Sequence, residues 1–158
     1  MTTTPLDAAL ATPDAAEAIN QHPGGWNRTM GLKFLTATPE LCVAELVVAD
    51  EHRQPYGIVH GGVHCGIIEA ACSTGAAVFA AAAGRSVVGL ENSTSFLRAV
   101  RGGTLRVTAK PVTRGRRSQV WEATVTDETG RAVATGRVRL MCLEPGDAIA
   151  GGPATMGG

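Results

Sequence analysis

The sequence is poor in aromatic side chains and has no excess charge of either sign, and each shortage excludes a class of protein. Aromatic residues make up only 4% of its 158 residues, so we expect a core of small and β-branched side chains. Fourteen Lys and Arg balance fourteen Asp and Glu, so no overall field attracts nucleic acid or an anionic membrane. Because 44% of the residues are hydrophobic, the chain can fold as one globular domain rather than stay disordered.

The sequence also lacks a paired cysteine motif and a basic leader segment. Its four cysteines form no C-x-x-C pair and no Cys/His spacing of the zinc-binding kind, so we interpret them as small buried thiols in a reducing compartment. The apolar stretch near the N-terminus follows no basic region and contains Asp7 and Asp14, unlike a secretory signal peptide. Both features predict a cytoplasmic protein.

Two terminal segments, residues 1–22 and 145–158, are rich in Ala, Thr, Pro and Gly. We predict that they are flexible tails, because they carry too little apolar surface to order themselves. The domain then spans residues 23–144 and begins with a predicted hairpin at 32–36 and 41–49. β-branched segments bounded by turn residues predict four further strands, at 86–98, 104–112, 118–126 and 131–143. Apolar and polar residues alternate in the middle two, which predicts one packed and one solvated face.

Between these groups of strands, residues 57–84 read GIVHGGVHCGIIEAACSTGAAVFAAAAG. From Gly61 to Gly84 the only formally charged residue is Glu69, and an Ala-rich segment without proline predicts a long helix wrapped by other elements. A membrane span is a poorer interpretation, because an acid sits near the middle and Ala inserts weakly. Two strands, one helix and four strands predict an α+β fold, in which a curved antiparallel β-sheet wraps around one long central α-helix.

Glu69 is the strongest candidate for chemistry in the chain. A carboxylate in an otherwise uncharged helix costs free energy unless a partner compensates it, and such groups often serve as a base or nucleophile. The alternative is a structural Glu that reaches solvent or pairs with an arginine of the sheet. Ser73 follows at i+4, where its hydroxyl can bond the carboxylate or hold a water, or else bond its own backbone.

The segment His60-Gly61-Gly62 stands where loop gives way to helix. Free N–H groups of a first helical turn point at developing negative charge, which is the arrangement of an oxyanion hole. Gln54, in the preceding loop, can donate to the same oxygen. An ordinary glycine-rich helix cap is the alternative.

The spacing of Gly61 and Glu69 predicts a dimer. They are eight residues apart, about 12 Å along a helix, whereas a reacting carbonyl must lie about 3 Å from both. If both serve one site, the helix must meet a second copy that runs antiparallel. A two-fold dimer does this and gives two composite sites.

A metal site is the competing interpretation of the same region. His60 and His64 are four residues apart and could bind an ion together with Glu69. We predict no metal, because His60 falls at or before the helix start and the five-residue step to Glu69 leaves the face of His64.

Positive charge gathers in one stretch of the chain. Seven basic residues and no acid lie between Asn92 and Trp121. Within it, Arg114-Gly115-Arg116-Arg117-Ser118 is a glycine turn with three guanidiniums, which suits phosphate groups. Few aromatic residues accompany it to stack bases, so we expect a small polyphosphate ligand rather than nucleic acid.

Together these residues resemble the hotdog-fold acyl-CoA thioesterases, in particular the hydroxybenzoyl-CoA thioesterases that use a glutamate and their dihydroxynaphthoyl-CoA relatives. The resemblance runs from about Trp26 to Leu143. It is carried by Gln54, by GIVHGGVHCGIIEAACS at 57–73, by VVGLENSTSFLR at 87–98 and by GRRSQVWEATVTDETGR at 115–131.

The resemblance implies a hydrolase that converts acyl-CoA and water to an acid and CoA, with no metal and no cofactor beyond the CoA of the substrate. Glu69 would be the nucleophile or general base, and Ser73 would position the carboxylate or the water. The Gly61 N–H of the partner subunit would stabilise the oxyanion, helped by Gln54 and His60. Assembly into a homotetramer built from two homodimers is usual in this family, and we expect neither nucleic acid nor a membrane as partner.

The resemblance also implies where the substrate lies. The pantetheine and acyl groups would follow Gly89, Phe96, Leu97, Arg98 and Ala99, and the nucleotide phosphates would meet Thr113, Arg114, Gly115, Arg116, Arg117 and Ser118. We expect Ile67, Ile68 and Val78 to line a pocket for an aromatic or medium-length acyl group. Two alternatives stay open: a non-catalytic acyl-CoA sensor on the same fold, and an enoyl-CoA hydratase, whose usual Asp and His motif we do not find.

Overall fold

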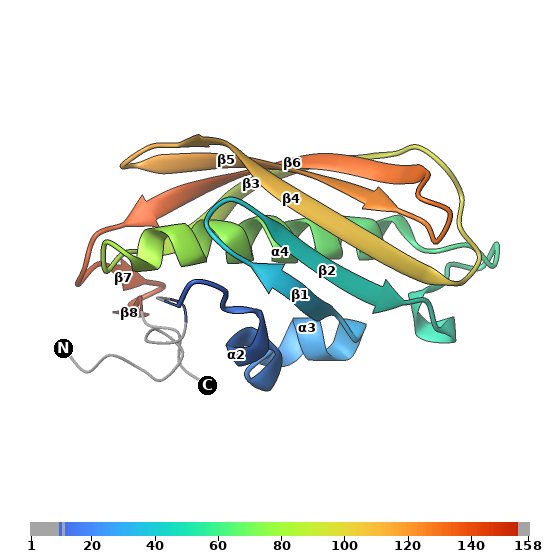
Figure 1. The fold of residues 1–158 in the computed structure, drawn as a ribbon, viewed down its shortest axis with the longest axis horizontal. Helices are drawn as coiled ribbons and strands as arrows, with labels where there is room; N and C mark the ends of the chain where they lie inside the picture. Colours follow the sequence, from blue (N-terminus) through green and yellow to red (C-terminus); the bar gives the residue numbers. More distant parts are fainter. Residues whose placement is uncertain (1–9, 11, 155–158) are drawn as a thin grey trace.

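The structure is a computed structural model that describes residue 10 and residues 12–154 (Figure 1). Its helical elements are α2 (Ala16–Gln21), α3 (Gly24–Met30), the short 3₁₀ helix η1 (Asp50–His52) and α4 (Gly61–Ala81). The strands are β1 (Lys33–Ala37), β2 (Cys42–Val47), β3 (Ser86–Phe96), β4 (Thr104–Arg114), β5 (Ser118–Thr126), β6 (Ala132–Leu143), β7 (Ala148–Ile149) and β8 (Gly152–Pro153).

Six of these strands form one antiparallel sheet in the order β1-β2-β4-β5-β6-β3. The sheet curves around α4, and α2 and α3 lie below α4 in the view of Figure 1. The predicted α+β fold, a curved antiparallel sheet around one long central helix, is confirmed. Two predicted ends were too long: α4 stops at Ala81 rather than Gly84, and β3 stops at Phe96 rather than Arg98.

The inner face of the sheet is the face that alternation predicted. Leu105, Val107 and Ala109 of β4 are fully buried, and on β5 Trp121 and its apolar neighbours are buried too. Trp121 fits only because Gly75 of α4 has no side chain: a Cβ there would lie 2.4 Å from the indole ring. The core is therefore a layer of mostly small side chains in which one large ring packs directly on the helix backbone.

The apolar helix α4 is explained by this packing. It is long enough and, at a mean hydropathy of 1.4, apolar enough to span a membrane. Its sheet-facing side chains, among them Ile67, Ile68 and Cys72, are fully buried beneath the strands. The apolar composition by itself fits either a membrane span or a core helix, and this burial shows that α4 is a core helix.

The prediction of a flexible tail over residues 1–22 is wrong for most of the described part of that segment. Residues 16–21 form α2, which packs on β1 with Ile19 buried. Asn20 donates to Phe34 O at 2.8 Å and accepts from Phe34 N at 2.9 Å, and the Asp14 carboxylate accepts from Ala37 N at 2.9 Å. Polar side chains thus tie the segment to the edge of the sheet; residues 1–9 and 11 lie outside the described part.

The predicted tail at 145–158 also needs correction. β7 and β8 pair as a short antiparallel hairpin, and Ser86 Oγ donates to Ala154 O at 2.7 Å. This bond joins the hairpin to the first residue of β3. Residues 155–158 lie outside the described part of the chain.

Candidate active site

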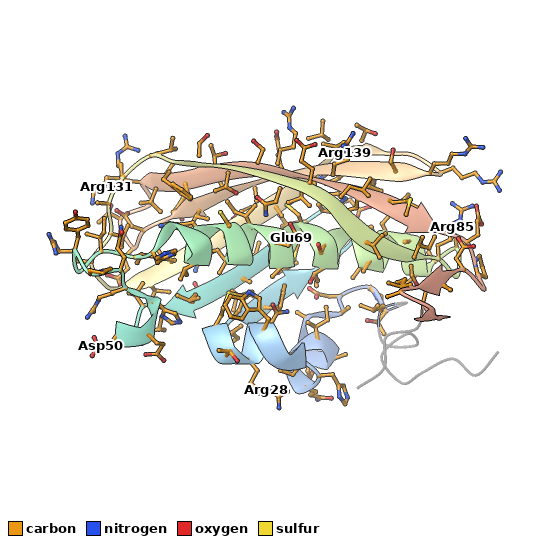
Figure 2. All side chains as sticks on the ribbon, turned by 180° about the vertical axis from the view of Figure 1, so that it is seen from behind. Arg28, Asp50, Glu69, Arg85, Arg131 and Arg139 are labelled. Carbon is orange, nitrogen blue, oxygen red and sulfur yellow. The ribbon has the colours of Figure 1, made fainter. Side chains whose placement is uncertain are left out.

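Glu69 lies near the middle of α4 (Figure 2), and its carboxylate is held from two elements. Ser73 Oγ, one turn further along α4, donates to Glu69 Oε1 at 3.1 Å. Asn92 Nδ2, from β3, donates to Glu69 Oε2 at 2.9 Å. No Lys or Arg pairs with Glu69 among the described residues. In the described residues Glu69 therefore does not form the structural ion pair with a sheet arginine that was the alternative interpretation.

Gly89 of β3 lies directly against the same carboxylate. A Cβ at this position would be 2.6 Å from Glu69 Oε1, so any larger residue would displace the side chain. Gly89 thus contacts Glu69 in the same subunit, where sequence had suggested a place on the pantetheine path.

Sequence reasoning missed Asn92. Its signal was weak: a run of five polar residues, 91–95, inside a strand with apolar ends. Such a run is typical of a solvated strand, yet Asn92 turns its amide toward the helix and bonds both Glu69 and Cys65 O, the latter at 3.2 Å.

The N-terminus of α4 carries the other predicted group. His60 caps the helix, because its Nδ1 accepts from Gly62 N at 2.9 Å. The Gly61 N–H donates to no backbone group of the described chain. A Cβ at Gly61 would lie 2.8 Å from the Phe96 ring, so this glycine permits a close aromatic contact at the helix start.

Gln54 stands in the tight turn that leads into this helix end. Its backbone N–H donates to Ile58 O at 2.9 Å, and its own carbonyl accepts from Gly57 N at 2.8 Å. The side chain is half-buried and bonds no group in the described residues. It is therefore available for a ligand near the start of α4.

His64, one turn into α4, is buried and packs near Phe96, with ring centroids 6.1 Å apart. Burial lowers the pKa of His64, and its Nδ1 has no partner in the described chain. No group of three or more His, Cys, Asp or Glu side chains that could hold a metal ion is found in residues 10 and 12–154.

One subunit does not bring Gly61 and Glu69 together. They stand on the same straight helix, eight residues and about 12 Å apart. A single subunit therefore holds the two halves of the predicted composite site at separate places along α4.

The predicted CoA contacts are also divided between the two ends of α4. Phe96, Leu97, Arg98 and Ala99 lie at the N-terminal end, where Phe96 covers Gly61. The turn from Thr113 to Ser118 lies at the C-terminal end, where the Arg114 guanidinium sits 4.6 Å from the centre of the Phe79 ring.

Two of the three guanidiniums in that turn already have acidic partners. Arg114 bonds Glu40 at 3.3 Å, and Arg116 bonds Glu144 at 3.2 Å. Arg117 has no side-chain partner within the described residues. A phosphate group bound here would therefore compete with two exposed ion pairs, and such pairs contribute little to the free energy of folding.

A cleft of about 910 Å³ runs along α4 beside Glu69. One wall is α3 with Trp26, which is 62% exposed, and the other is α4 with Glu69 and Ser73. The expectation that Ile67, Ile68 and Val78 line a pocket is wrong, because they face the sheet and are buried in the core. The α4 residues that line the cleft are instead Gly66, Glu69, Ala70, Ser73, Thr74 and Ala77.

This architecture, a curved antiparallel sheet around a long helix, is the hotdog fold. The solved structure of a Mycobacterium tuberculosis esterase matches it with a TM-score of 0.74 and 43% identity over 75% of this chain and 96% of that one. A Haemophilus influenzae thioesterase structure matches with a TM-score of 0.77 and 27% identity, over 82% of this chain and 90% of that one.

Sequence comparison leads to the same group. The profile of the thioesterase superfamily matches residues 56–134. The 1,4-dihydroxy-2-naphthoyl-CoA hydrolase of Listeria monocytogenes is 33% identical over 116 residues, which cover 73% of this chain and 94% of that protein. The chain belongs to the thioesterase superfamily and is a thioester hydrolase.

Proposed function

We propose that the chain hydrolyses an acyl-CoA thioester to the free acid and CoA, with Glu69 as nucleophile or general base. The observation that carries the proposal is the Glu69 carboxylate, which Ser73 and Asn92 hold in the wall of a cleft of about 910 Å³. The Listeria relative, named for a CoA thioester, supports CoA esters as the substrate class.

Two routes use the carboxylate, and both sum to acyl-CoA plus water giving acid plus CoA. As nucleophile, a Glu69 oxygen attacks the thioester carbonyl carbon, the C–S bond breaks, CoA takes up a proton, and water hydrolyses the resulting anhydride. As general base, Glu69 takes a proton from the water that attacks the same carbon; the C–S bond then breaks and the proton passes to the departing CoA sulfur. Each route develops negative charge on the carbonyl oxygen, and neither needs a metal or a redox cofactor.

In this proposal the oxyanion donor is the Gly61 N–H of the partner subunit, with His60 and Gln54 beside it. The first support is the spacing of about 12 Å between Gly61 and Glu69 along one helix. The second is β3, an eleven-residue strand at the open edge of the sheet, because a long unpaired edge is a template for pairing. Two β3 edges that pair around a two-fold axis would run the α4 helices antiparallel and bring Gly61 of each toward Glu69 of the other.

We propose that the acyl group occupies the cleft between α3 and α4. Its floor is built from small side chains such as Gly66, Ala70 and Ala77, and Trp26 adds an exposed ring to one wall. Such a mixture of apolar surface and a few polar groups is typical of small-molecule sites. An aromatic or medium-length acyl group would lie flat against Trp26 with its carbonyl at Glu69.

The first test measures thiol release from benzoyl, hydroxybenzoyl, phenylacetyl, dihydroxynaphthoyl and straight-chain CoA esters. Glu69→Gln keeps the size of the side chain but cannot act as base or carboxylate nucleophile, so we expect kcat to fall by at least about a hundredfold. Glu122→Gln is the control, because Glu122 is exposed on the outer face of the sheet and pairs with Arg137. Retained activity in Glu69→Gln, or binding of CoA esters without turnover by the unaltered protein, would overturn the proposal.

A second test addresses the composite site. Gly61 is the first residue of α4, and His60 before it is already extended at φ −67° and ψ 137°, so Gly61→Pro removes the N–H at a position that tolerates proline. Gly61→Ala is the matched control, since it adds a side chain against Phe96 but keeps the N–H. Each of Gly61→Pro and Glu69→Gln alone should be inactive.

Mixing these two inactive variants makes the test specific. Random exchange of subunits gives a mixed dimer with one intact site, so about a quarter of the unaltered activity should return. No recovery after verified subunit exchange would contradict a site shared between subunits. It would leave the role of Glu69, tested separately, untouched.

A further inference from the structure

We propose that Asn92 is a positioning residue that fixes the Glu69 carboxylate for reaction, and that Thr94 in turn fixes Asn92. This inference rests on the proposed role of Glu69 and assigns a function to two residues of β3 that were not among the predicted substrate contacts.

The hydrogen bonds determine which way the Asn92 amide points. Its nitrogen lies 2.9 Å from Glu69 Oε2 and 3.2 Å from Cys65 O, and a carboxylate and a carbonyl oxygen only accept. Its oxygen accepts from Thr94 Oγ1 at 2.6 Å. Every polar atom of the amide is therefore used, and rotation of the amide would lose the two bonds to Glu69 and Cys65, whose oxygens only accept.

The carboxylate is thus held on both oxygens from two elements. Ser73 reaches Oε1 from within α4, whereas Asn92 reaches Oε2 from β3. The helix contact alone would allow Glu69 to swing with its own rotamers, since Ser73 stands on the same helix. The contact from β3 fixes the carboxylate relative to the sheet, which a reactive group needs if a misplacement of about 1 Å is costly.

Two glycines keep the space for this arrangement. A Cβ at Gly89 would lie 2.6 Å from Glu69 Oε1, and a Cβ at Gly136 would lie 2.8 Å from Thr94 Oγ1. Gly136 stands opposite Thr94 in the β3–β6 ladder. Both ends of the hydrogen-bonded series Thr94–Asn92–Glu69 therefore lie against glycines, which have no side chain.

A purely structural role is the competing explanation, because Asn92 also ties β3 to the backbone of α4 at Cys65. The two roles predict different kinetics. A positioning residue lowers kcat with little change in KM and acts only through Glu69, whereas a structural tie lowers stability whether or not Glu69 is present.

The experiment uses Asn92→Asp, which keeps the shape of the side chain but, in its ionised form, has no hydrogen to donate and adds a like charge beside Glu69. We expect kcat to fall about ten- to hundredfold, as for loss of a hydrogen bond to a charged group, with KM within about twofold. In a Glu69→Gln background the same substitution should change the residual rate by less than about twofold, because the two residues act as a unit.

Thr94 provides the matched pair. Thr94→Val removes the hydroxyl at constant shape and should lower kcat about three- to tenfold, whereas Thr94→Ser keeps the hydroxyl and should stay near the unaltered rate. Full activity of Asn92→Asp alongside an inactive Glu69→Gln would overturn this inference and leave the proposed function standing. Equal losses from Asn92→Asp in both backgrounds would overturn it too, whereas an active Glu69→Gln would overturn the proposed function itself.

Discussion

The two long faces of α4 both carry small residues but have opposite roles. The face toward the sheet carries Ile67, Ile68, Ala71, Cys72 and Ala76, all fully buried. The face toward the cleft carries Gly66, Glu69, Ala70, Ser73, Thr74 and Ala77, and Glu69 and Ser73 on it are partly exposed. The comparison shows that small apolar side chains serve two purposes on one helix: on one face they fill a core, and on the other they leave room.

The sharpest test of this comparison removes bulk from each face in turn. Ile67→Ala leaves a cavity under the sheet and should lower the free energy of unfolding by about 2–5 kcal/mol. Thr74→Ala on the cleft face should change it by less than about 0.5 kcal/mol, since partly exposed positions contribute little. Urea unfolding of both variants measures this difference. Equal losses would mean that the cleft face is packed as tightly as the core.

The sequence could not show which face of α4 meets the sheet and which meets the cleft. A segment that is apolar all round gives no amphipathic signal, so Ile67, Ile68 and Val78 could be assigned to a pocket as readily as to a core. The fold itself was predictable, because strand alternation, turn residues and an Ala-rich run lacking charge are local patterns. Glu69 and Ser73 were found for the same reason: their spacing is a local property of one helix.

What sequence missed depends on partners far along the chain. The six residues of α2 have too little apolar surface to predict order, and they are held by Asp14 and Asn20, which bond the backbone of β1. Asn92 is 23 residues from Glu69, and no local pattern in a single sequence links an amide in a polar strand to an acid in a distant helix.

A second pair of substitutions adds bulk instead of removing it. Gly75→Ala would place a Cβ 2.4 Å from the buried Trp121 ring, which cannot move, and should cost about 1–3 kcal/mol of unfolding free energy. Gly66→Ala would meet Met30 Sδ at 2.9 Å and Trp26 Nε1 at 3.2 Å. It should change stability by less than about 1 kcal/mol, because Met30 can shift and Ala favours the helix. A larger loss from Gly66→Ala than from Gly75→Ala in thermal unfolding would reverse the assignment of the faces.

Trp26 tests whether the cleft face binds the acyl group. The residue is 62% exposed, so Trp26→Ala should affect folding little. Loss of its ring from the cleft should raise KM for aromatic acyl-CoA esters about tenfold, which corresponds to about 1.4 kcal/mol of binding. KM for acetyl-CoA, whose acyl group has no ring to stack on Trp26, serves as internal control, and Trp26→Phe should retain most of the preference. A uniform rise for all esters would place the acyl group elsewhere.

The smallest expected effect tests whether Ser73, on the cleft face, contributes to catalysis through its hydroxyl or only to packing. Ser73 bonds Glu69 Oε1 at 3.1 Å from the same helix, while Asn92 continues to hold Oε2. Ser73→Ala should therefore lower kcat only about fivefold, equivalent to about 1 kcal/mol, with the free energy of unfolding unchanged within about 0.5 kcal/mol. Ser73→Thr keeps the hydroxyl and should retain the rate. If Thr at this position were as slow as Ala, the hydroxyl would not be the group that matters, and the carboxylate would be oriented by β3 alone.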